Sequence, residues 1–331
     1  VALKSEKSQK GLQFKEEEKV GIITPYAAQT RLIRALIQDY RQKDTTAVSC
    51  ATVHQFQGSE RNVVIFDAVE SYPFVKPGWL VAKNENGSVM RLINVALTRA
   101  RCKFITLANT RFWYNKFHET QNTYFKLLEH IKTNDTVVSM KENSLIEFIQ
   151  GLDFGKNIKA FYTADDACEL LLKDIKSAKK QIFITLPTDK LNPEYESAIA
   201  DALKAQSRAG VTVTGKAKEI IGLNETWNNL LFKSKDASFP LIVIDDRITW
   251  YGFPLSVLFF EDKNYKFYAP KSPIFRIIGK HTNEMIHSLC DLEYRIDDKG
   301  MKIRLSEKAN NTAGKGLTEF INNTESCNKC G

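Results

Sequence analysis

The sequence predicts an α/β protein with two domains, one after the other. In residues 1–135 and again in residues 156–297, short apolar runs alternate with longer segments whose apolar residues recur every three or four positions. Short apolar runs are typical of buried strands and periodic segments of helices, so their alternation indicates parallel sheets covered by helices. With 331 residues, the chain is long enough to form two or three hydrophobic cores.

The first region is expected to contain four strands and three helices. The strands are predicted at residues 20–23, 48–53, 62–67 and 103–108, and the helices at residues 27–40, 91–101 and 112–131. Ligands of parallel sheets bind beyond the carboxyl ends of the strands. Those ends are predicted at residues 24–26, at residues 52–60 and in the turn after Asp67.

Two of these predicted ends carry side chains with distinctive chemistry. Tyr26 has a ring that can stack on a base, and Gly58 allows positive φ and close approach of the backbone to a ligand. Glu60 can accept hydrogen bonds from ribose hydroxyls, and Thr52 and His54 can donate to backbone phosphates. Tyr26, Glu60 and His54 also have ordinary explanations: a tyrosine packed at the sheet boundary, a solvated loop carboxylate and a loop histidine without a special role.

Three arginines, Arg91, Arg99 and Arg101, are expected on one amphipathic helix at residues 91–101. A packed helix holds a guanidinium group with little positional freedom, which suits the recognition of phosphate. Taken alone, a surface helix that carries arginines is the simpler explanation.

Three segments of this region resemble motifs IV, V and VI of superfamily 1 helicases. They are GIITPYAAQ (residues 21–29), ATVHQFQGSERNVVIFD (51–67) and RLINVALTRAR (91–101), in that order. The most similar group contains the nonsense-mediated decay helicase and senataxin. The resemblance implies that residues 1–135 form a second RecA-like domain, which closes on ATP held by a first RecA-like domain.

The resemblance also implies roles for residues that meet the nucleotide. Arg99 resembles the arginine finger that reaches the γ-phosphate and stabilises charge in phosphoryl transfer. Glu60 resembles the acid that binds ribose, and Tyr26 and Gln29 resemble the motif IV residues that line the nucleotide cleft. Many relatives have arginine directly after this tyrosine, where the chain has Ala27, so either Arg31 takes over a second γ-phosphate contact or that contact is missing.

Further roles concern nucleic acid. Gln57 and Gly58 resemble the motif V turn that couples the nucleotide cleft to the nucleic-acid groove. Thr52 resembles a contact to the phosphate backbone, and His54 is placed with it as a nucleic-acid-binding residue.

The sequence contains no G-x-x-x-x-G-K-[ST] segment and no clear acidic pair for magnesium on a strand. We therefore expect ATP and Mg²⁺ to be held largely by a first RecA-like domain that precedes Val1. The chain begins without Met and ends one residue after a Cys-x-x-Cys, which fits a part of a longer polypeptide.

After an expected linker at residues 136–155, the second region predicts another α/β domain at residues 156–297. Helices are expected at residues 164–178, 195–208 and 224–232, and strands at residues 181–186, 210–214, 241–245 and 248–251. A tight turn is expected at Asp246 and Arg247, between the last two strands.

Residues 239–252 (FPLIVIDDRITWYG) resemble the core of phospholipase D-like domains, whose active signature is H-x-K-x4-D. The aligned positions are Ser238, Pro240 and Asp245, so the histidine nucleophile and the phosphate-binding lysine are absent. A serine without a base does not replace the nucleophile, and proline carries no charge. The resemblance implies an inactive α/β module that binds nucleic acid or a partner.

Residues 298–331 are expected to form a linker and the start of a zinc-binding module. Cys327 and Cys330 supply two of the four ligands that tetrahedral zinc needs, and the others would lie beyond Gly331. The other four cysteines lie among hydrophobic neighbours, as in reduced cytoplasmic proteins. No apolar run approaches the ~20 residues of a membrane span.

These features predict the C-terminal half of an ATP-dependent nucleic-acid helicase or translocase. The net charge of +8 suits a sequence-independent grip on the phosphate backbone of single-stranded or duplex nucleic acid, with DNA slightly favoured over RNA. No membrane partner is expected, the expected location is cytoplasmic, and the oligomeric state is not predicted. Two alternatives stay open: a non-catalytic nucleic-acid-binding scaffold, and a phospholipase D-like nuclease or restriction effector.

Overall fold

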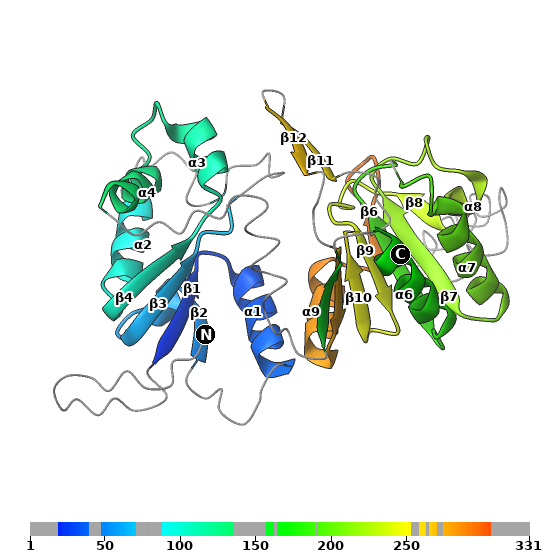
Figure 1. Cartoon of the computed structure of the whole chain (residues 1–331), viewed down its shortest axis with the longest axis horizontal. Coiled ribbons are helices and arrows are strands. Elements are labelled where there is room, and N and C mark those ends of the chain that lie inside the picture. The colour runs from blue at the N-terminus through cyan, green and yellow to red at the C-terminus, as the bar shows by residue number, and fades with distance from the viewer. Residues whose placement is uncertain are drawn as a thin grey trace, which may run out of the picture. The chain divides into compact units, whose positions relative to one another are not determined.

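The computed structural model describes residues 19–39, 48–70, 78, 88–134, 157–161, 164–189, 191–252, 258–262, 265–269 and 274–305. The chain divides into two compact units, Val1–Ser139 and Met140–Gly331. Each unit combines a central sheet with helices (Figure 1), so the predicted α/β class is confirmed.

The first unit is built on a four-stranded sheet whose strands are all parallel. The strands are β1 (Val20–Thr24), β2 (Val48–Thr52), β3 (Arg61–Asp67) and β4 (Ala100–Leu107), in the order β2-β1-β3-β4. Ile23, Val64 and Phe66 on the central strands β1 and β3 are at most 1% exposed. These three residues lie on one face of the sheet, whereas Val63 and Ile65 on the other face of β3 are only half-buried.

Four α-helices and one 3₁₀ helix complete the described part of the first unit. They are α1 (Ala27–Asp39), η3 (His54–Phe56), α2 (Ser88–Leu97), α3 (Thr110–Phe117) and α4 (Thr123–Thr133). Leu92, Ile93 and Ala96 of α2 are buried in one core with Trp113 of α3 and Tyr124 of α4. The apolar stripe predicted for this helix therefore faces the core.

The helix predicted at residues 91–101 ends earlier, at Leu97. The backbone amide of Thr98 still donates to Asn94, but the carbonyl of Arg99 accepts from the amide of Arg61 at 2.9 Å. Strand pairing with β3 thus replaces helical hydrogen bonding. Arg99 lies in the turn after α2 and Arg101 lies on β4, so the prediction of one arginine-bearing helix is wrong.

The single helix predicted at residues 112–131 is also wrong, because the chain forms α3 and α4 with a break between them. Each helix has its own asparagine N-cap. Asn109 Oδ1 accepts from the amide of Phe112 at 3.0 Å, and Asn122 Oδ1 accepts from the amide of Phe125 at 2.9 Å. A side chain that satisfies a free amide at a helix start favours a new helix there.

Residues 53–60 cross the sheet from the end of β2 to the start of β3, and Gly21 makes room for them. A Cβ on Gly21 would lie 2.6 Å from Phe56 Cζ and 2.9 Å from Arg61 Cγ. The guanidinium carbon of Arg61 lies 5.3 Å from the centre of the Phe56 ring. Gly21, Phe56 and Arg61 therefore pack as one layer that holds this crossing segment on the sheet.

The second unit contains a seven-stranded mixed sheet in the order β5-β13-β10-β9-β6-β7-β8. The strands are β5 (Ile158–Phe161), β6 (Gln181–Leu186), β7 (Thr212–Ala217), β8 (Leu231–Lys233), β9 (Leu241–Ile244), β10 (Ile248–Tyr251) and β13 (Ile274–Ile278). β6, β7 and β8 are parallel neighbours, and the other pairs are antiparallel.

Two small hairpins accompany this sheet. β11 (Leu258–Asp262) pairs with β12 (Tyr265–Ala269), and β14 (Tyr294–Ile296) pairs with β15 (Lys302–Arg304). β15 lies beyond residue 297, where the sequence predicts the start of a linker.

The described helices of the second unit are α6 (Ala164–Lys176), α7 (Glu196–Arg208), α8 (Glu225–Asn228) and α9 (Lys280–Leu289). Leu171 of α6 and Leu203 of α7 are fully buried against Ile182 and Ile184 of β6. None of the helices in the described part of the chain combines the length and apolar character that a bilayer crossing requires.

The helix predicted at residues 224–232 is wrong in its second half, since α8 ends at Asn228. Leu231, Phe232 and Lys233 instead pair in parallel with β7 and become the edge strand β8. A place on the sheet edge satisfies their backbone groups, and this tertiary pairing overrides the helical pattern.

We expect Gly21→Ala to destabilise the first unit by about 1–3 kcal/mol, because the added methyl group overpacks the layer formed with Phe56 and Arg61. Hydrogen exchange of the amides of β1 and β3 measures this loss. In a Phe56→Leu background the smaller side chain relieves the clash, so the cost of Gly21→Ala should fall by more than half. Equal costs in the two backgrounds would contradict this packing.

Candidate functional site

Residues from two distant segments meet where β3 and β4 begin. Arg101 Nε donates to Glu60 Oε2 at 2.9 Å, and both side chains are exposed to solvent by 40–45%. Their meeting depends on the backbone, since the amide of Arg61 donates to the carbonyl of Arg99 and Arg61 pairs with Ala100. We call Glu60, Arg61, Arg99 and Arg101 the amino-edge cluster.

The amino-edge cluster keeps Glu60 ionised. The hydrogen bond from Arg101 and the charge of Arg101 lower the pKa of the Glu60 carboxyl, slight desolvation opposes this, and the charge of Arg99 lowers the pKa further. Arg61 Nη1 also donates to the backbone carbonyl of Glu60 at 2.7 Å. Glu60 is therefore fixed through its backbone and its side chain, and it presents a negatively charged acceptor to solvent.

One nitrogen of the Arg99 side chain is buried without a hydrogen-bond acceptor in the described residues. Its Nη2 donates to Thr98 Oγ1 at 3.1 Å, whereas its Nε is buried and finds no hydrogen-bond partner within the described part of the chain. A buried donor without an acceptor costs on the order of 1–3 kcal/mol. This arrangement suits an anionic acceptor brought by a ligand.

A second group of polar residues lies where β1 and β3 end. The Tyr26 hydroxyl donates to Glu70 Oε1, and Gln29 Nε2 donates to Asp67 Oδ2 at 2.8 Å. Glu70 is only 5% exposed. We call Tyr26, Gln29, Asp67 and Glu70 the carboxyl-edge cluster. Sequence reasoning missed Asp67 and Glu70 as partners, although the available signal was their place at the end of a predicted strand and just after it.

Backbone strain accompanies the carboxyl-edge cluster. Val69 has φ of 63°, a left-handed conformation that a β-branched residue rarely adopts. Its amide donates to Asp67 Oδ1 at 3.1 Å. Strain of this kind, about 1–3 kcal/mol, persists only where surrounding contacts impose it.

The two clusters lie at opposite edges of the sheet. Thr24 at the end of β1 pairs with Thr52 at the end of β2, whereas Arg61 at the start of β3 pairs with Ala100. β3 has seven residues, so its ends are separated by roughly 20 Å at ~3.3 Å per residue.

The interpretation of residues 52–60 as one carboxyl-end loop is therefore wrong. These residues leave the carboxyl edge at Thr52 and reach the amino edge at Glu60, because β2 and β3 are parallel strands of one sheet. The structure brings Glu60 close to Arg99. It leaves Tyr26 and Gln29 at the other edge.

The remaining predicted residues lie along the crossing segment. Thr52 ends β2, and its amide donates to Gln55 Oε1 at 3.5 Å. His54 begins η3 and is exposed. Gln57 and Gly58 follow η3, and Gly58 has φ of 80°, the left-handed conformation expected for a glycine in this turn.

No group of three or more histidine, cysteine, aspartate or glutamate side chains suited to a metal ion occurs in the described residues. Cys327 and Cys330 lie outside those residues. The zinc prediction therefore stays a prediction.

In the second unit, the side chain of Asp245 has a structural role. Its carboxylate accepts hydrogen bonds from the amides of Lys179, Lys180 and Gln181 at 2.8–3.0 Å. Burial raises the pKa of Asp245, but these three backbone donors outweigh it and the pKa is lowered. The Asp245 side chain thus ties the β9–β10 turn to the start of β6.

The turn itself is centred on Asp245 and Asp246, one residue earlier than predicted. Both have φ of 51°, and the amide of Arg247 donates to the carbonyl of Ile244 at 3.0 Å. This is the primed turn that matches the twist of a hairpin.

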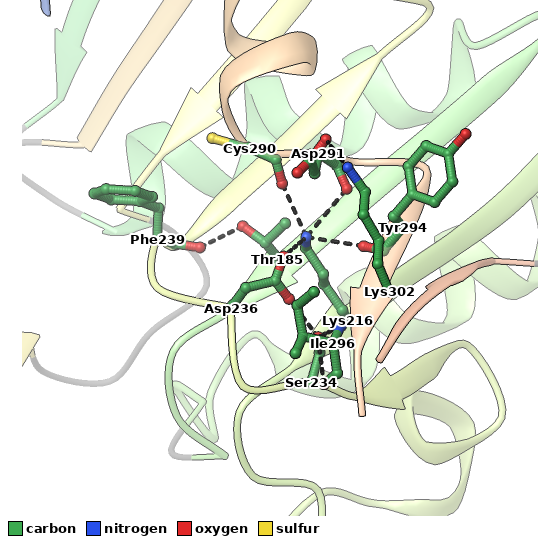
Figure 2. A network of polar contacts seen from close by, with 10 residues as sticks. All are labelled: Thr185, Lys216, Ser234, Asp236, Phe239, Cys290, Asp291, Tyr294, Ile296 and Lys302. Atoms are coloured by element: carbon green, nitrogen blue, oxygen red, sulfur yellow. Dashed lines mark hydrogen bonds and ion pairs between the residues drawn. The ribbon is translucent and has the colours of Figure 1, made fainter. Parts of the chain in front are cut away.

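Lys216 on β7 is a buried lysine in the same unit, only 1% exposed. Figure 2 shows its ammonium group surrounded by acceptors: Asp236 Oδ2 at 2.6 Å and the carbonyls of Cys290, Asp291 and Tyr294 at 2.8–3.1 Å. Every proton of the ammonium group is engaged. Lys216 therefore holds the segment after α9 onto the sheet and is not available to bind phosphate.

Comparison with known proteins supports the resemblance of the first region. A family model described as "AAA domain" matches residues 3–111. Helicase sen1 of Schizosaccharomyces pombe is 35% identical over 92 residues, which are 28% of this chain and 5% of that protein. ATP-dependent helicase upf1 of the same organism is 32% identical over 134 residues, 40% of this chain and 13% of that protein. The predicted similarity to superfamily 1 helicases of this group is confirmed.

A third relative is DNA polymerase alpha-associated DNA helicase A of Saccharomyces cerevisiae, which is 36% identical over 93 residues, 28% of this chain and 12% of that protein. The chain thus aligns with only 5–13% of the length of these three relatives.

Solved structures similar to the chain include two with low sequence identity. NucT from Helicobacter pylori is 19% identical, with a TM-score of 0.31, and the match covers 40% of this chain and 92% of that one. Nuc from Salmonella typhimurium, a phospholipase D family member, is 16% identical, with a TM-score of 0.30, over 45% of this chain and 98% of that one.

We expect Lys216→Met to lower the free energy of unfolding of the second unit by about 3–5 kcal/mol, because Asp236 and three carbonyls lose a buried partner. Urea unfolding followed by the fluorescence of Trp227 and Trp250, in a chain whose other tryptophans are replaced by phenylalanine, measures it. Lys302→Met is the matched control, since Lys302 pairs with Asp291 at 2.9 Å but is 48% exposed. Its cost should stay below about 1 kcal/mol. Similar costs for both variants would contradict the role of Lys216.

Proposed function

We propose that residues 1–135 form the second RecA-like domain of an ATP-dependent nucleic-acid helicase or translocase. This domain completes an ATP site that another RecA-like domain of the same protein largely holds. The amino-edge cluster carries the proposal, because it places the proposed ribose acceptor Glu60 and the proposed arginine finger Arg99 at one edge of one sheet.

The chemistry follows from charge and position. Closure of the two RecA-like domains on ATP brings the guanidinium group of Arg99 to the γ-phosphate, where it stabilises the charge that develops during transfer to water. Mg²⁺, which the other domain would hold, would reduce the negative charge of the phosphates during transfer. The buried Nε of Arg99 gains an acceptor on closure. Release of phosphate removes that acceptor and lets the domains separate.

The carboxyl edge is assigned to the nucleic-acid strand. Thr52 and His54 lie at or near this edge and can donate to backbone phosphates, and the ring of Tyr26 can stack on a base. A separation of roughly 20 Å from the amino edge keeps Tyr26 and Gln29 away from a nucleotide bound by Glu60. This assignment replaces the cleft-lining role that the resemblance implies for them.

The second unit is proposed to be an inactive, phospholipase D-like accessory module. Ser238 and Pro240 stand where the signature has histidine and lysine, and Asp245 and Lys216 are engaged in holding the fold. This disfavours a phospholipase D-like nuclease. Retention of Glu60 and Arg99 disfavours a non-catalytic scaffold. The substrate is proposed to be nucleic acid in the cytoplasm, with DNA ahead of RNA.

In the full-length protein, we expect Arg99→Ala to lower the kcat of nucleic-acid-stimulated ATP hydrolysis by about 10³-fold, the effect of losing an arginine finger. Phosphate release under saturating ATP and nucleic acid measures kcat. Arg208→Ala, at the exposed end of α7, makes the same chemical change away from the cluster and should leave kcat within about twofold. A small effect of Arg99→Ala would overturn the finger assignment.

The 331-residue chain alone should hydrolyse no ATP above background, because it supplies only one side of the proposed site. The same phosphate-release measurement on the purified chain, with and without single-stranded DNA or RNA, tests this. Hydrolysis that is lost in the Arg99→Ala chain would show that the chain holds a complete ATP site.

A further inference from the structure

Only one of the two carboxylate oxygens of Glu60 accepts a hydrogen bond within the described residues. Arg101 Nε donates to Oε2 at 2.9 Å, and no other side chain in the described part of the chain bonds to the Glu60 carboxylate. Arg101 uses a single nitrogen in this contact, so the arrangement is not the two-pronged pairing in which a guanidinium group occupies both oxygens. Oε1 remains able to accept a hydrogen bond from a ligand.

The position of Arg101 is set by the sheet. Arg101 is the second residue of β4, directly after Ala100, which pairs with Arg61. Glu60 is fixed from the other side, because Arg61 Nη1 holds its carbonyl at 2.7 Å and Arg61 Nε donates to Ser49 Oγ at 3.2 Å. The Glu60 carboxylate thus lies between its own fixed backbone and a cation whose backbone belongs to β4.

We propose that Arg101 is a positioning residue that orients Glu60 so that Oε1 accepts a ribose hydroxyl, and that it thereby sets the preference of the site for ribonucleotides. This inference rests on the proposed function, in which Glu60 meets the ribose. Arg101 acts through Glu60 and does not touch the nucleotide, in contrast to Arg99. The two arginines of the T-R-A-R segment therefore have different tasks: Arg99 acts on the phosphate and Arg101 on the sugar-binding acid.

The different environments of the two arginines support this division. Arg99 lies in a turn with its Nε buried and unpaired in the described structure, which suits a donor waiting for an anion. Arg101 lies on a strand, is 40% exposed in its side chain and already has an acceptor. Arg101 is thus already engaged with the proposed sugar-binding acid, whereas the Nε of Arg99 has no acceptor within the described residues.

The test uses the full-length protein and two nucleotides, ATP and 2′,3′-dideoxy-ATP, which lacks the ribose hydroxyls. Arg101→Ala is expected to raise the KM for ATP about two- to fivefold, the range that loss of an exposed ion pair supports, with kcat within about twofold. The KM for 2′,3′-dideoxy-ATP should not change. Arg101→Lys, which keeps a cation, should restore part of the preference for ATP.

Equilibrium binding supplies a readout that does not depend on turnover. Isothermal titration with the non-hydrolysable β,γ-imido analogue of ATP, and with its 2′,3′-dideoxy form, should show the same loss of preference in Arg101→Ala. A fall in kcat would mean that Arg101 contacts the transferred phosphate. An equal rise in KM for both nucleotides would mean a general effect of charge. Either result overturns the positioning role.

Glu60→Ala, which removes both acceptor oxygens, separates this proposal from the one on which it rests. If Glu60→Ala leaves the preference for ATP over 2′,3′-dideoxy-ATP unchanged, Glu60 does not bind the ribose and the proposed function loses that contact. If Glu60→Ala abolishes the preference and Arg101→Ala does not reduce it, the ribose contact stands and Arg101 has no part in it.

Discussion

One backbone hydrogen bond determines the geometry of the first unit's site. The amide of Arg61 donates to the carbonyl of Arg99 at 2.9 Å, and from this point β3 and β4 run parallel. The same bond ends the helical course of α2 and delivers Glu60 and Arg101 to one place. The pairing then shifts by one residue, from Arg61 with Ala100 to Val63 with Lys103, so Arg101 lies at an irregularity between the two strands.

The crossing segment, residues 53–60, explains why the site is at the amino edge. A parallel connection must return to the start of the next strand, and here it does so with only one short 3₁₀ turn over the sheet. Gly21 permits that path, because no side chain separates β1 from Phe56 and Arg61. In the proposed function, this segment joins the nucleotide at one edge to the nucleic-acid strand at Thr52.

In the second unit, the charged side chains of Asp245 and Lys216 stabilise the fold. The Asp245 carboxylate accepts hydrogen bonds from three backbone amides, and the ammonium group of Lys216 donates to four surrounding acceptors. Both side chains fix loops to the sheet, and neither is left to act on a ligand. Arg99 differs from both, because its Nε lacks an acceptor in the described residues. Its side chain is therefore suited to a ligand, whereas those of Asp245 and Lys216 hold the structure together.

The sequence by itself determined the α/β class, the four strands of the first sheet to within three residues and the likeness to helicases, because apolar runs and short motifs are local signals. Only the tertiary structure decided where the helix of the T-R-A-R segment ends, since the pairing of Arg61 with Ala100 is a contact between distant segments. It also decided that Glu60 and Tyr26 lie at opposite edges, because the path of a connection over a sheet leaves no periodic pattern in the residues. Arg101 was visible in the sequence as a cation. Its place beside Glu60 exists only because two parallel strands begin side by side.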